Sequence, residues 1–215
     1  MNFLAHCVLG ALASESRNEG LIAGGILGDL CKGAIPAHWP PEIRAGIRLH
    51  RRVDAVSNQH PGIRRSCARF PADLRRLAPV LVDIHADLAL AGFWNTHVAQ
   101  PQPDFIQRCN GVIGNWREWG LELPASAERF LDFIVERDLL TAYGTWDGVG
   151  LCMESVARRL RKPDLPGPAL AICQALSEAL CADFNSYFPD LQTEARRFIG
   201  AHFKCSPLDD EIREQ

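Results

Sequence analysis

The sequence predicts a single all-α domain, and three observations carry this prediction. Apolar stretches of helical length follow one another along the chain, prolines stand where several of them begin, and no run alternates apolar and polar residues as a strand does. With 215 residues, 47% of them hydrophobic, the chain can bury one substantial core. We therefore expect one domain over residues 1–205 and a charged, frayed tail over 206–215.

The first half of the chain is expected to hold five helices. Proline fits the first helical turn, where its missing N–H has no partner within the helix, so Pro40-Pro41, Pro61 and Pro79 can each open one. No strand precedes Gly24-Gly25-x-x-Gly28, which therefore indicates close helix packing rather than a dinucleotide-binding turn. The expected helices cover 3–14, 20–32, the segment after Pro41 that carries His50, 62–77, and the segment from Pro79 to Trp94.

The second half is expected to begin with a loop over 95–104, which contains Pro101 and Pro103. Ser126 can cap a helix start, and Glu128 in the first turn opposes the positive end of the helix dipole. Pro166-Gly167-Pro168 separates the last two helices from the rest. The expected helices cover 104–119, 125–143, 148–162, 168–188 and 189–203.

Composition disfavours several classes of function. No apolar run is long enough to cross a membrane, and the start of the chain lacks the basic region of a signal peptide, so we expect a cytoplasmic protein without a membrane partner. The eight cysteines form no C-x-x-C pair and are expected to be reduced. Because the formal net charge is −3 and no nucleic-acid-binding motif is present, nucleic acid is not an expected partner.

Positive charge is concentrated in residues 41–80. This segment has nine arginines against three acidic residues, a local excess of +6, so the rest of the chain carries −9. A basic field on an acidic protein favours an anionic partner reached by electrostatic steering. A solvated helix face balanced by acidic neighbours is the alternative interpretation.

The densest chemistry lies in His50-Arg51-Arg52-Val53-Asp54. On a helix, His50 and Asp54 are four residues apart and face the same way, so both can reach one divalent cation. Arg51 and Arg52 supply planar guanidinium groups that suit a phosphate. A surface hydrogen bond within the His50–Asp54 pair is the alternative interpretation.

Four further polar residues interrupt apolar helices: His6, Asp29, Asp83 and Asp87. A carboxylate that faces a core is costly unless it is paired or bound to a metal. Each of these residues could be satisfied singly by a backbone donor or an arginine. Together with His50, however, they match the way in which helical bundles build internal metal sites, with ligands from several helices. Mixed imidazole and carboxylate ligands favour Mn²⁺ or Mg²⁺.

Five sequence elements occur in order over residues 1–94: Met1-Asn2-Phe3-Leu4-Ala5-His6, Gly28-Asp29 with Lys32-Gly33, Gly46-Ile47-x-x-His50-Arg51-Arg52-Val53-Asp54, His60-Pro61, and Arg75-Arg76-x-Ala78-Pro79-x-x-x-Asp83-x-x-x-Asp87. In this order and spacing they resemble the acyl carrier protein phosphodiesterase family, which is related to the HD-domain phosphohydrolases. Tyr143 and Arg158-Arg159 resemble a weaker late motif of the same family.

The resemblance implies an all-α, HD-domain-like enzyme. It would use Mn²⁺ (or Mg²⁺) to hydrolyse the phosphodiester that joins 4'-phosphopantetheine to a serine of holo-acyl carrier protein. The expected metal ligands are His6, Asp29, His50, Asp83 and Asp87, with Asp54 orienting His50. Arg51 and Arg52 would bind the phosphate, and the acidic carrier would dock on Arg44, Arg48, Arg64 and Arg65.

Two positions depart from the family pattern. Leu88 stands where the family has a histidine, and His85 lies about 60° away around a helix of about 100° per residue, where it could compensate. Ser57-Asn58 replaces a threonine–aspartate pair. Two other functions therefore stay open: hydrolysis of a nucleotide or other small phosphate, and carrier-protein binding without catalysis.

Overall fold

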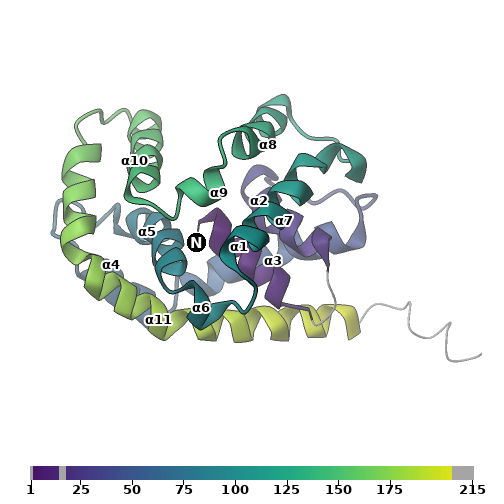
Figure 1. The fold of residues 1–215 in the computed structure, drawn as a ribbon, viewed down its shortest axis with the longest axis horizontal. Coiled ribbons are helices and arrows are strands. Elements are labelled where there is room, and N and C mark those ends of the chain that lie inside the picture. Colours follow the sequence, from purple (N-terminus) through teal and green to yellow (C-terminus); the bar gives the residue numbers. More distant parts are fainter. Residues whose placement is uncertain (1, 15–17, 205–215) are drawn as a thin grey trace, which may run out of the picture.

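A computed structural model of the chain describes residues 2–14 and 18–204 (Figure 1). Over these residues it contains eleven α-helices, one 3-10 helix and no strand, which confirms the all-α prediction. None of the described helices combines the length and the apolar character that a membrane span needs. The helices are α1 (Phe3–Leu12), α2 (Glu19–Leu30), α3 (Pro41–Ser57), α4 (Pro61–Ala68), α5 (Ala78–Gly92), α6 (Trp94–His97), α7 (Gln102–Gly114), η1 (Trp116–Trp119), α8 (Ala125–Glu136), α9 (Leu139–Ala142), α10 (Trp146–Leu160) and α11 (Pro166–Lys204).

Glycines set the close approach of α2 to α3. A Cβ added at Gly24 would lie 2.4 Å from the Cα of Gly46, and one added at Gly28 would lie 2.2 Å from the Cγ of His50. Non-bonded atoms do not come this close, so any larger residue at Gly24 or Gly28 would force the two helices apart. The glycine pattern therefore serves helix packing, as predicted, and it brings His50 against α2.

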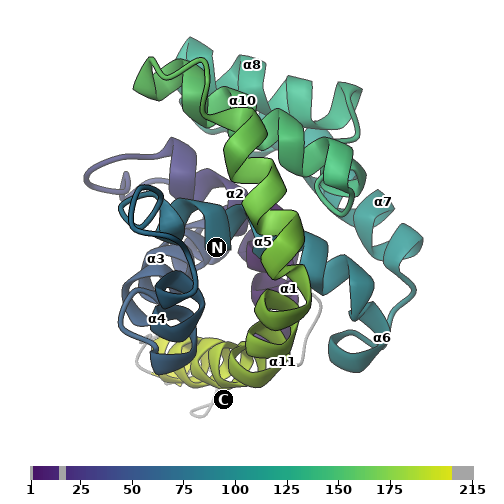
Figure 2. The same cartoon turned by 90° about the vertical axis from the view of Figure 1, so that its left-hand side faces the viewer.

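The two closing helices that the sequence predicts are one continuous helix, α11, with Pro189 in its interior. An interior proline costs about 3 kcal/mol, because it removes a hydrogen bond and crowds the preceding turn. Phe184, Phe188 and Leu191 flank it and are at most 1% exposed. Full burial of each such side chain is worth about 1.5–3 kcal/mol, which outweighs that cost. Figures 1 and 2 show α11 passing beneath the molecule, where it contacts α3, α4 and α5.

Three other predicted boundaries are wrong. The helix predicted over 62–77 ends at Ala68, because Pro71 follows and disfavours helical geometry before it. The predicted loop 95–104 contains α6 and the start of α7, with Pro103 in the first helical turn. The helix predicted over 125–143 is interrupted at Asp138, whose φ is +45°. The predicted frayed tail 206–215 lies outside the described residues.

Candidate functional site

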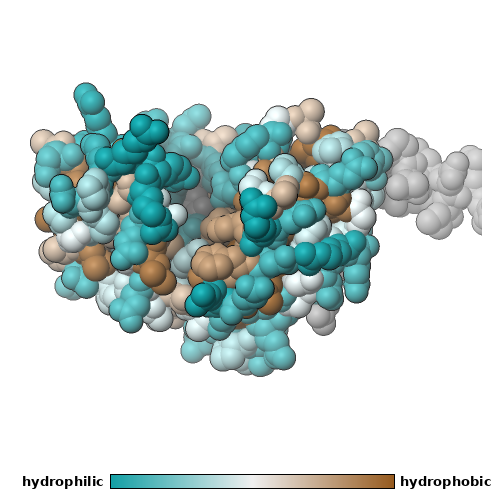
Figure 3. Space-filling model, turned by 90° about the horizontal axis from the view of Figure 1, so that it is seen from above, coloured by the Kyte–Doolittle hydropathy of each residue, from teal (hydrophilic) through white to brown (hydrophobic). Residues whose placement is uncertain are grey.

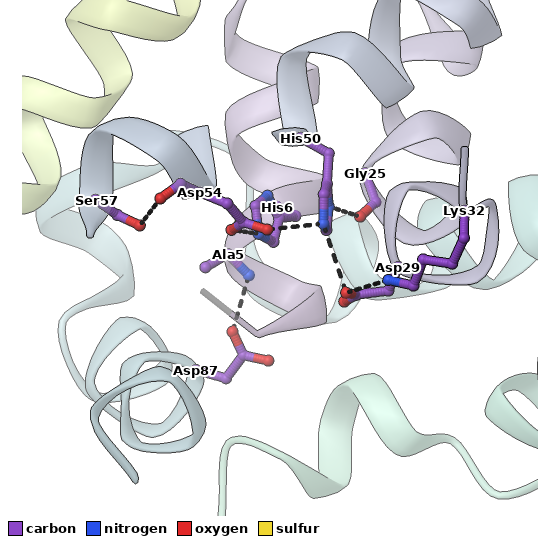
Figure 4. Close-up of polar contacts among 9 residues, drawn as sticks. All are labelled: Ala5, His6, Gly25, Asp29, Lys32, His50, Asp54, Ser57 and Asp87. Atoms are coloured by element: carbon purple, nitrogen blue, oxygen red, sulfur yellow. Dashed lines mark hydrogen bonds and ion pairs between the residues drawn. The ribbon is translucent and has the colours of Figure 1, made fainter. Parts of the chain in front are cut away.

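Four of the predicted polar residues meet where α1, α2 and α3 pack together (Figure 4). Asp54 Oδ1 lies 3.1 Å from His6 Nε2, and Asp54 Oδ2 lies 3.2 Å from His50 Nε2. Asp29 Oδ1 lies 3.7 Å from His50 Nε2, on the side away from His6. The imidazole rings of His6 and His50 stack with their centroids 3.8 Å apart.

A backbone carbonyl fixes the orientation of His50. Its Nδ1 lies 2.8 Å from the carbonyl oxygen of Gly25, so Nδ1–H donates and Nε2 faces the two carboxylates. Metal-binding histidines commonly donate their second ring N–H to a carbonyl or carboxylate in this way, which holds the other nitrogen ready as a ligand. The same hydrogen bond links α3 to α2.

The electrostatics of the cluster favour a bound positive charge. Burial and the nearby His50 lower the pKa of His6 to about 3. Burial would also lower the pKa of His50, but hydrogen bonds with Asp29 and Asp54 raise it to about 9. The pKa of Asp54 is lowered in spite of its burial, because His50 and His6 both hydrogen-bond to it. Asp29 and Asp54 thus stabilise a positive charge at His50.

The donor set fits a divalent cation. Ligand atoms of His6, His50 and Asp54 all lie within 4.8 Å of one another. The two imidazole side chains are almost fully buried, whereas those of Asp54 and Asp29 are 40% and 43% exposed. An ion held here would be reached from the carboxylate side, which leaves room for water or substrate, as catalytic metal sites require. Asp54 contacts both histidines, so it can act as a ligand itself and not only as the orienting group that the sequence predicts.

Asp87 has a different environment from that expected of a metal ligand. It is fully buried, and its carboxylate accepts the N–H groups of Leu4 (3.0 Å) and Ala5 (2.9 Å) at the N-terminus of α1. These N–H groups have no partner within the helix, and the positive end of its dipole favours the contact. Burial raises the pKa of Asp87 to about 7. Asp87 thus anchors the helix that carries His6.

One turn earlier on α5, Asp83 lines the same cavity as Asp29 and Asp54, and burial raises its pKa. His85 does not take the place of the histidine that Leu88 replaces. Its Nε2 lies 3.2 Å from Ser177 Oγ of α11, and its ring lies against Trp146 of α10. Leu88 packs against the hydrophobic core.

The predicted phosphate clamp is divided between two environments. Arg51 donates to the carbonyl of Cys31 (2.8 Å) and lines a recess of about 250 Å³ with Asp29, His50, Asp54 and Lys32. Arg52 instead donates through Nε to Glu194 of α11 (2.7 Å). Adjacent residues on a helix point in different directions, so only Arg51 reaches the cluster.

The four arginines predicted to dock a carrier have different neighbours in the structure. Arg65 pairs with the buried Asp183 of α11 at 2.7 Å. Arg44 donates to the carbonyl of Ala37 at 3.1 Å, and both Arg44 and Arg48 lie close enough to His202 to lower its pKa along with burial. Arg64 is exposed on α4. Arg44 and Arg48, one helical turn apart on α3, thus lie near the end of α11, whereas Arg65 pairs with Asp183. That these four arginines dock a carrier stays a prediction.

A cavity of about 790 Å³ opens beside the cluster and is lined by residues of α8 and α10. These helices form two arms of the molecule in Figure 1, and Figure 3 shows the hollow on this side. Its floor includes Asp29, Asp54 and Asp83, and its rim includes the cations Lys32, Arg158 and Arg159. Its apolar wall includes Phe3, Val80, Ile84, Phe130, Phe133, Leu139, Leu151 and Val156.

The sequence did not reveal this cavity wall. Phe130 and Phe133 lie three residues apart on an amphipathic helix, and such spacing predicts core residues. In the structure Phe133 is 45% exposed and faces the cavity together with Leu151, which is 53% exposed. Only the three-dimensional arrangement separates the lining of a cavity from the core.

Comparison with known proteins identifies one family. The family model described as "Acyl carrier protein phosphodiesterase" matches residues 1–191. An acyl carrier protein phosphodiesterase of Salmonella newport (strain SL254) is 29% identical over 201 residues, which is 92% of this chain and 98% of that protein. One of Yersinia pestis is 40% identical over 114 residues, which is 53% of this chain and 56% of that protein. No solved structure matches the chain.

Proposed function

The chain belongs to the acyl carrier protein phosphodiesterase family, and from this premise we propose that it hydrolyses the phosphodiester between 4'-phosphopantetheine and a serine of holo-acyl carrier protein. Water adds to phosphorus, the bond from phosphorus to the serine oxygen breaks, and that oxygen takes up a proton. The products are apo-acyl carrier protein and 4'-phosphopantetheine. The observation that carries the proposal is the His6–His50–Asp54 cluster beside a cavity with an apolar wall and a basic rim.

We propose Mn²⁺ or Mg²⁺ as the metal, held by His6, His50, Asp54 and Asp29, with Asp83, which lines the same cavity, as a further ligand. The support is the donor set, the histidine orientation fixed by Gly25 and the partial exposure of both carboxylates. A divalent cation there would withdraw charge from a phosphoryl oxygen and lower the pKa of attacking water.

The remaining residues would bind and orient the substrate. Arg51 and Lys32 bring two positive charges to the recess at the cluster, where they can balance the phosphodiester. The apolar wall suits the methylene and amide groups of the phosphopantetheine arm and excludes water around it. Asp87 is a positioning residue, because it acts through α1 and His6. A cytoplasmic location and a relation to HD-domain phosphohydrolases stay predictions.

The test is intact-mass measurement of holo-acyl carrier protein after incubation with the purified chain and MnCl₂. Wild type is expected to remove the phosphopantetheine mass, and Asp54→Asn is expected to abolish the loss. Asp190→Asn is the matched control, because Asp190 pairs with His60, is largely exposed and lines neither the cavity nor the recess at the cluster. Binding of the carrier without mass change would favour the non-catalytic module, and hydrolysis of small phosphates alone would favour the other alternative.

A further inference from the structure

The reaction itself restricts where the carrier can dock. The bond that breaks is attached directly to the serine side chain, so the surface of the carrier must come within one side-chain length of the metal cluster. Docking residues therefore have to border the opening of the cavity that holds Asp29 and Asp54. Arg44, Arg48 and Arg65, which are directed toward Ala37, His202 and Asp183, do not line this cavity.

Of the three cations that line the cavity, Lys32 follows α2 and the other two come from the C-terminal end of α10. Arg158 and Arg159 line the cavity, and the side chain of Arg158 is 72% exposed. Arg161 and Lys162 continue the basic run, and both are exposed. The run carries four positive charges against Glu154 and Asp164 nearby in sequence. Figure 3 shows strongly hydrophilic side chains gathered on the side of the hollow that α10 forms.

The backbone fixes this basic end. Arg161 adopts the left-handed conformation with φ of +56°, and the N–H of Lys162 donates to the carbonyl of Ala157 at 2.9 Å. This hydrogen bond ends α10 and holds Arg161 and Lys162 close to the last turn of the helix. Basic residues in a last turn also offset the helix dipole, but that effect is worth only about 0.3–1 kcal/mol and does not require four cations.

Exposed apolar side chains accompany the charges. Leu160 is 42% exposed among the basic residues, and Leu151 is 53% exposed in the cavity wall. The Glu154–Arg158 contact is long, at 3.9 Å, and links two exposed side chains, so it holds Arg158 only weakly. A protein interface commonly combines such apolar contacts with complementary charge, and arginine is enriched in interfaces.

We propose that an acidic carrier protein docks on the C-terminal end of α10, through Arg158, Arg159, Arg161 and Lys162 around Leu160. Lys32 supplies positive charge on another part of the rim. This inference rests on the proposed function. It places the docking surface at the end of α10 and not on the arginine-rich segment 41–80. The carrier then covers the opening of the cavity and presents its serine-linked phosphodiester to the cluster.

The test compares two double charge reversals that change the net charge equally. Arg158→Glu/Arg159→Glu alters the proposed surface, and Arg64→Glu/Arg76→Glu alters exposed arginines of the segment 41–80. The dissociation constant of fluorescently labelled holo-acyl carrier protein is measured by anisotropy for both variants, with kcat and KM alongside. The α10 variant is expected to bind about tenfold or more weakly and to raise KM, because like charges now face the acidic carrier.

Salt and folding controls complete the design. The difference between wild type and the α10 variant should shrink in about 1 M salt, where the Debye length falls to about 3 Å. Thermal melting of both variants verifies folding. Unchanged affinity of the α10 variant, or an equal loss in the Arg64/Arg76 variant, would overturn the inference. If wild type binds the carrier but releases no phosphopantetheine, the proposed function fails, while the affinities still decide where the carrier docks.

Discussion

His50 occupies the space that any side chain at residue 28 would need, since a Cβ on Gly28 would lie 2.2 Å from the Cγ of His50. Gly28→Ala should therefore push the imidazole away from Asp29 and Asp54 while leaving all the candidate ligands present. Misplacement of a catalytic group by about 1 Å can cost about 100-fold in rate, and we expect a loss of that order in kcat/KM for holo-acyl carrier protein. Steady-state kinetics with MnCl₂ would measure it.

Gly111→Ala is the matched control for this substitution. Nothing lies within 4 Å of a Cβ at Gly111, which is in α7, away from the cluster. Alanine is favoured over glycine in a helix by about 0.5–1 kcal/mol, so this variant should be slightly more stable and fully active. Full activity of Gly28→Ala would show that the contact with His50 can relax without consequence.

Asp87 should matter first for stability. Asp87→Ala leaves the buried N–H groups of Leu4 and Ala5 without their acceptor, and each unsatisfied group costs about 1–3 kcal/mol. We expect the free energy of unfolding to fall by about 2–5 kcal/mol in urea titrations. Asp87→Asn keeps one acceptor oxygen and should lose less. Equal stability of wild type and Asp87→Ala would contradict the anchoring role.

The sequence predicts the centre of this site better than its surroundings. His6, Asp29, His50 and Asp54 are detectable because polar side chains on apolar helices are costly and require partners. The roles of Arg52 and Arg65 are not detectable, because their partners Glu194 and Asp183 lie 142 and 118 residues further along the chain. Residue spacing gives the direction of a side chain on its own helix, but not which distant helix packs beside it.

The same limit applies to the fold. Most helices are found from apolar periodicity and from proline at their starts, as α3, α4 and α5 show. Pro189 predicts a break that does not occur, because tertiary burial around it outweighs the local cost. Local rules therefore locate the helices, and long-range packing decides their ends.

Asp183 should control acid stability. Burial alone would raise its pKa, but Arg69, Arg65 and Ser66 hydrogen-bond to the carboxylate and lower it. A lowered pKa means that the stabilisation is present above the unfolded-state value of about 3.9 and is lost as pH falls through the folded value. Asp183→Asn should cost about 2–4 kcal/mol at pH 7, less than a fully buried pair because Arg65 is half-exposed.

The measurement is urea unfolding of wild type and Asp183→Asn between neutral and acidic pH. The difference between the two proteins should shrink at acidic pH, because protonation removes the charge that the substitution removes. Asp190→Asn is the control, since its pair with His60 is exposed and worth at most about 1 kcal/mol. A difference that stays constant down to the lowest pH would show that charge pairing is not the cause.

Metal binding should release a proton from the cluster. His50 has a pKa raised to about 9 in the metal-free chain, and a ligand nitrogen must be deprotonated, so Mn²⁺ has to displace this proton at neutral pH. The apparent affinity for Mn²⁺ should therefore rise about tenfold per pH unit below about 9 and level off above it. Isothermal titration calorimetry in buffers of different ionisation enthalpy counts the released proton directly.

At about 100 times its dissociation constant, Mn²⁺ should add about 2.7 kcal/mol of stability to wild type and none to His50→Ala. Equal stabilisation of both proteins, or an affinity that does not change with pH, would place the metal elsewhere.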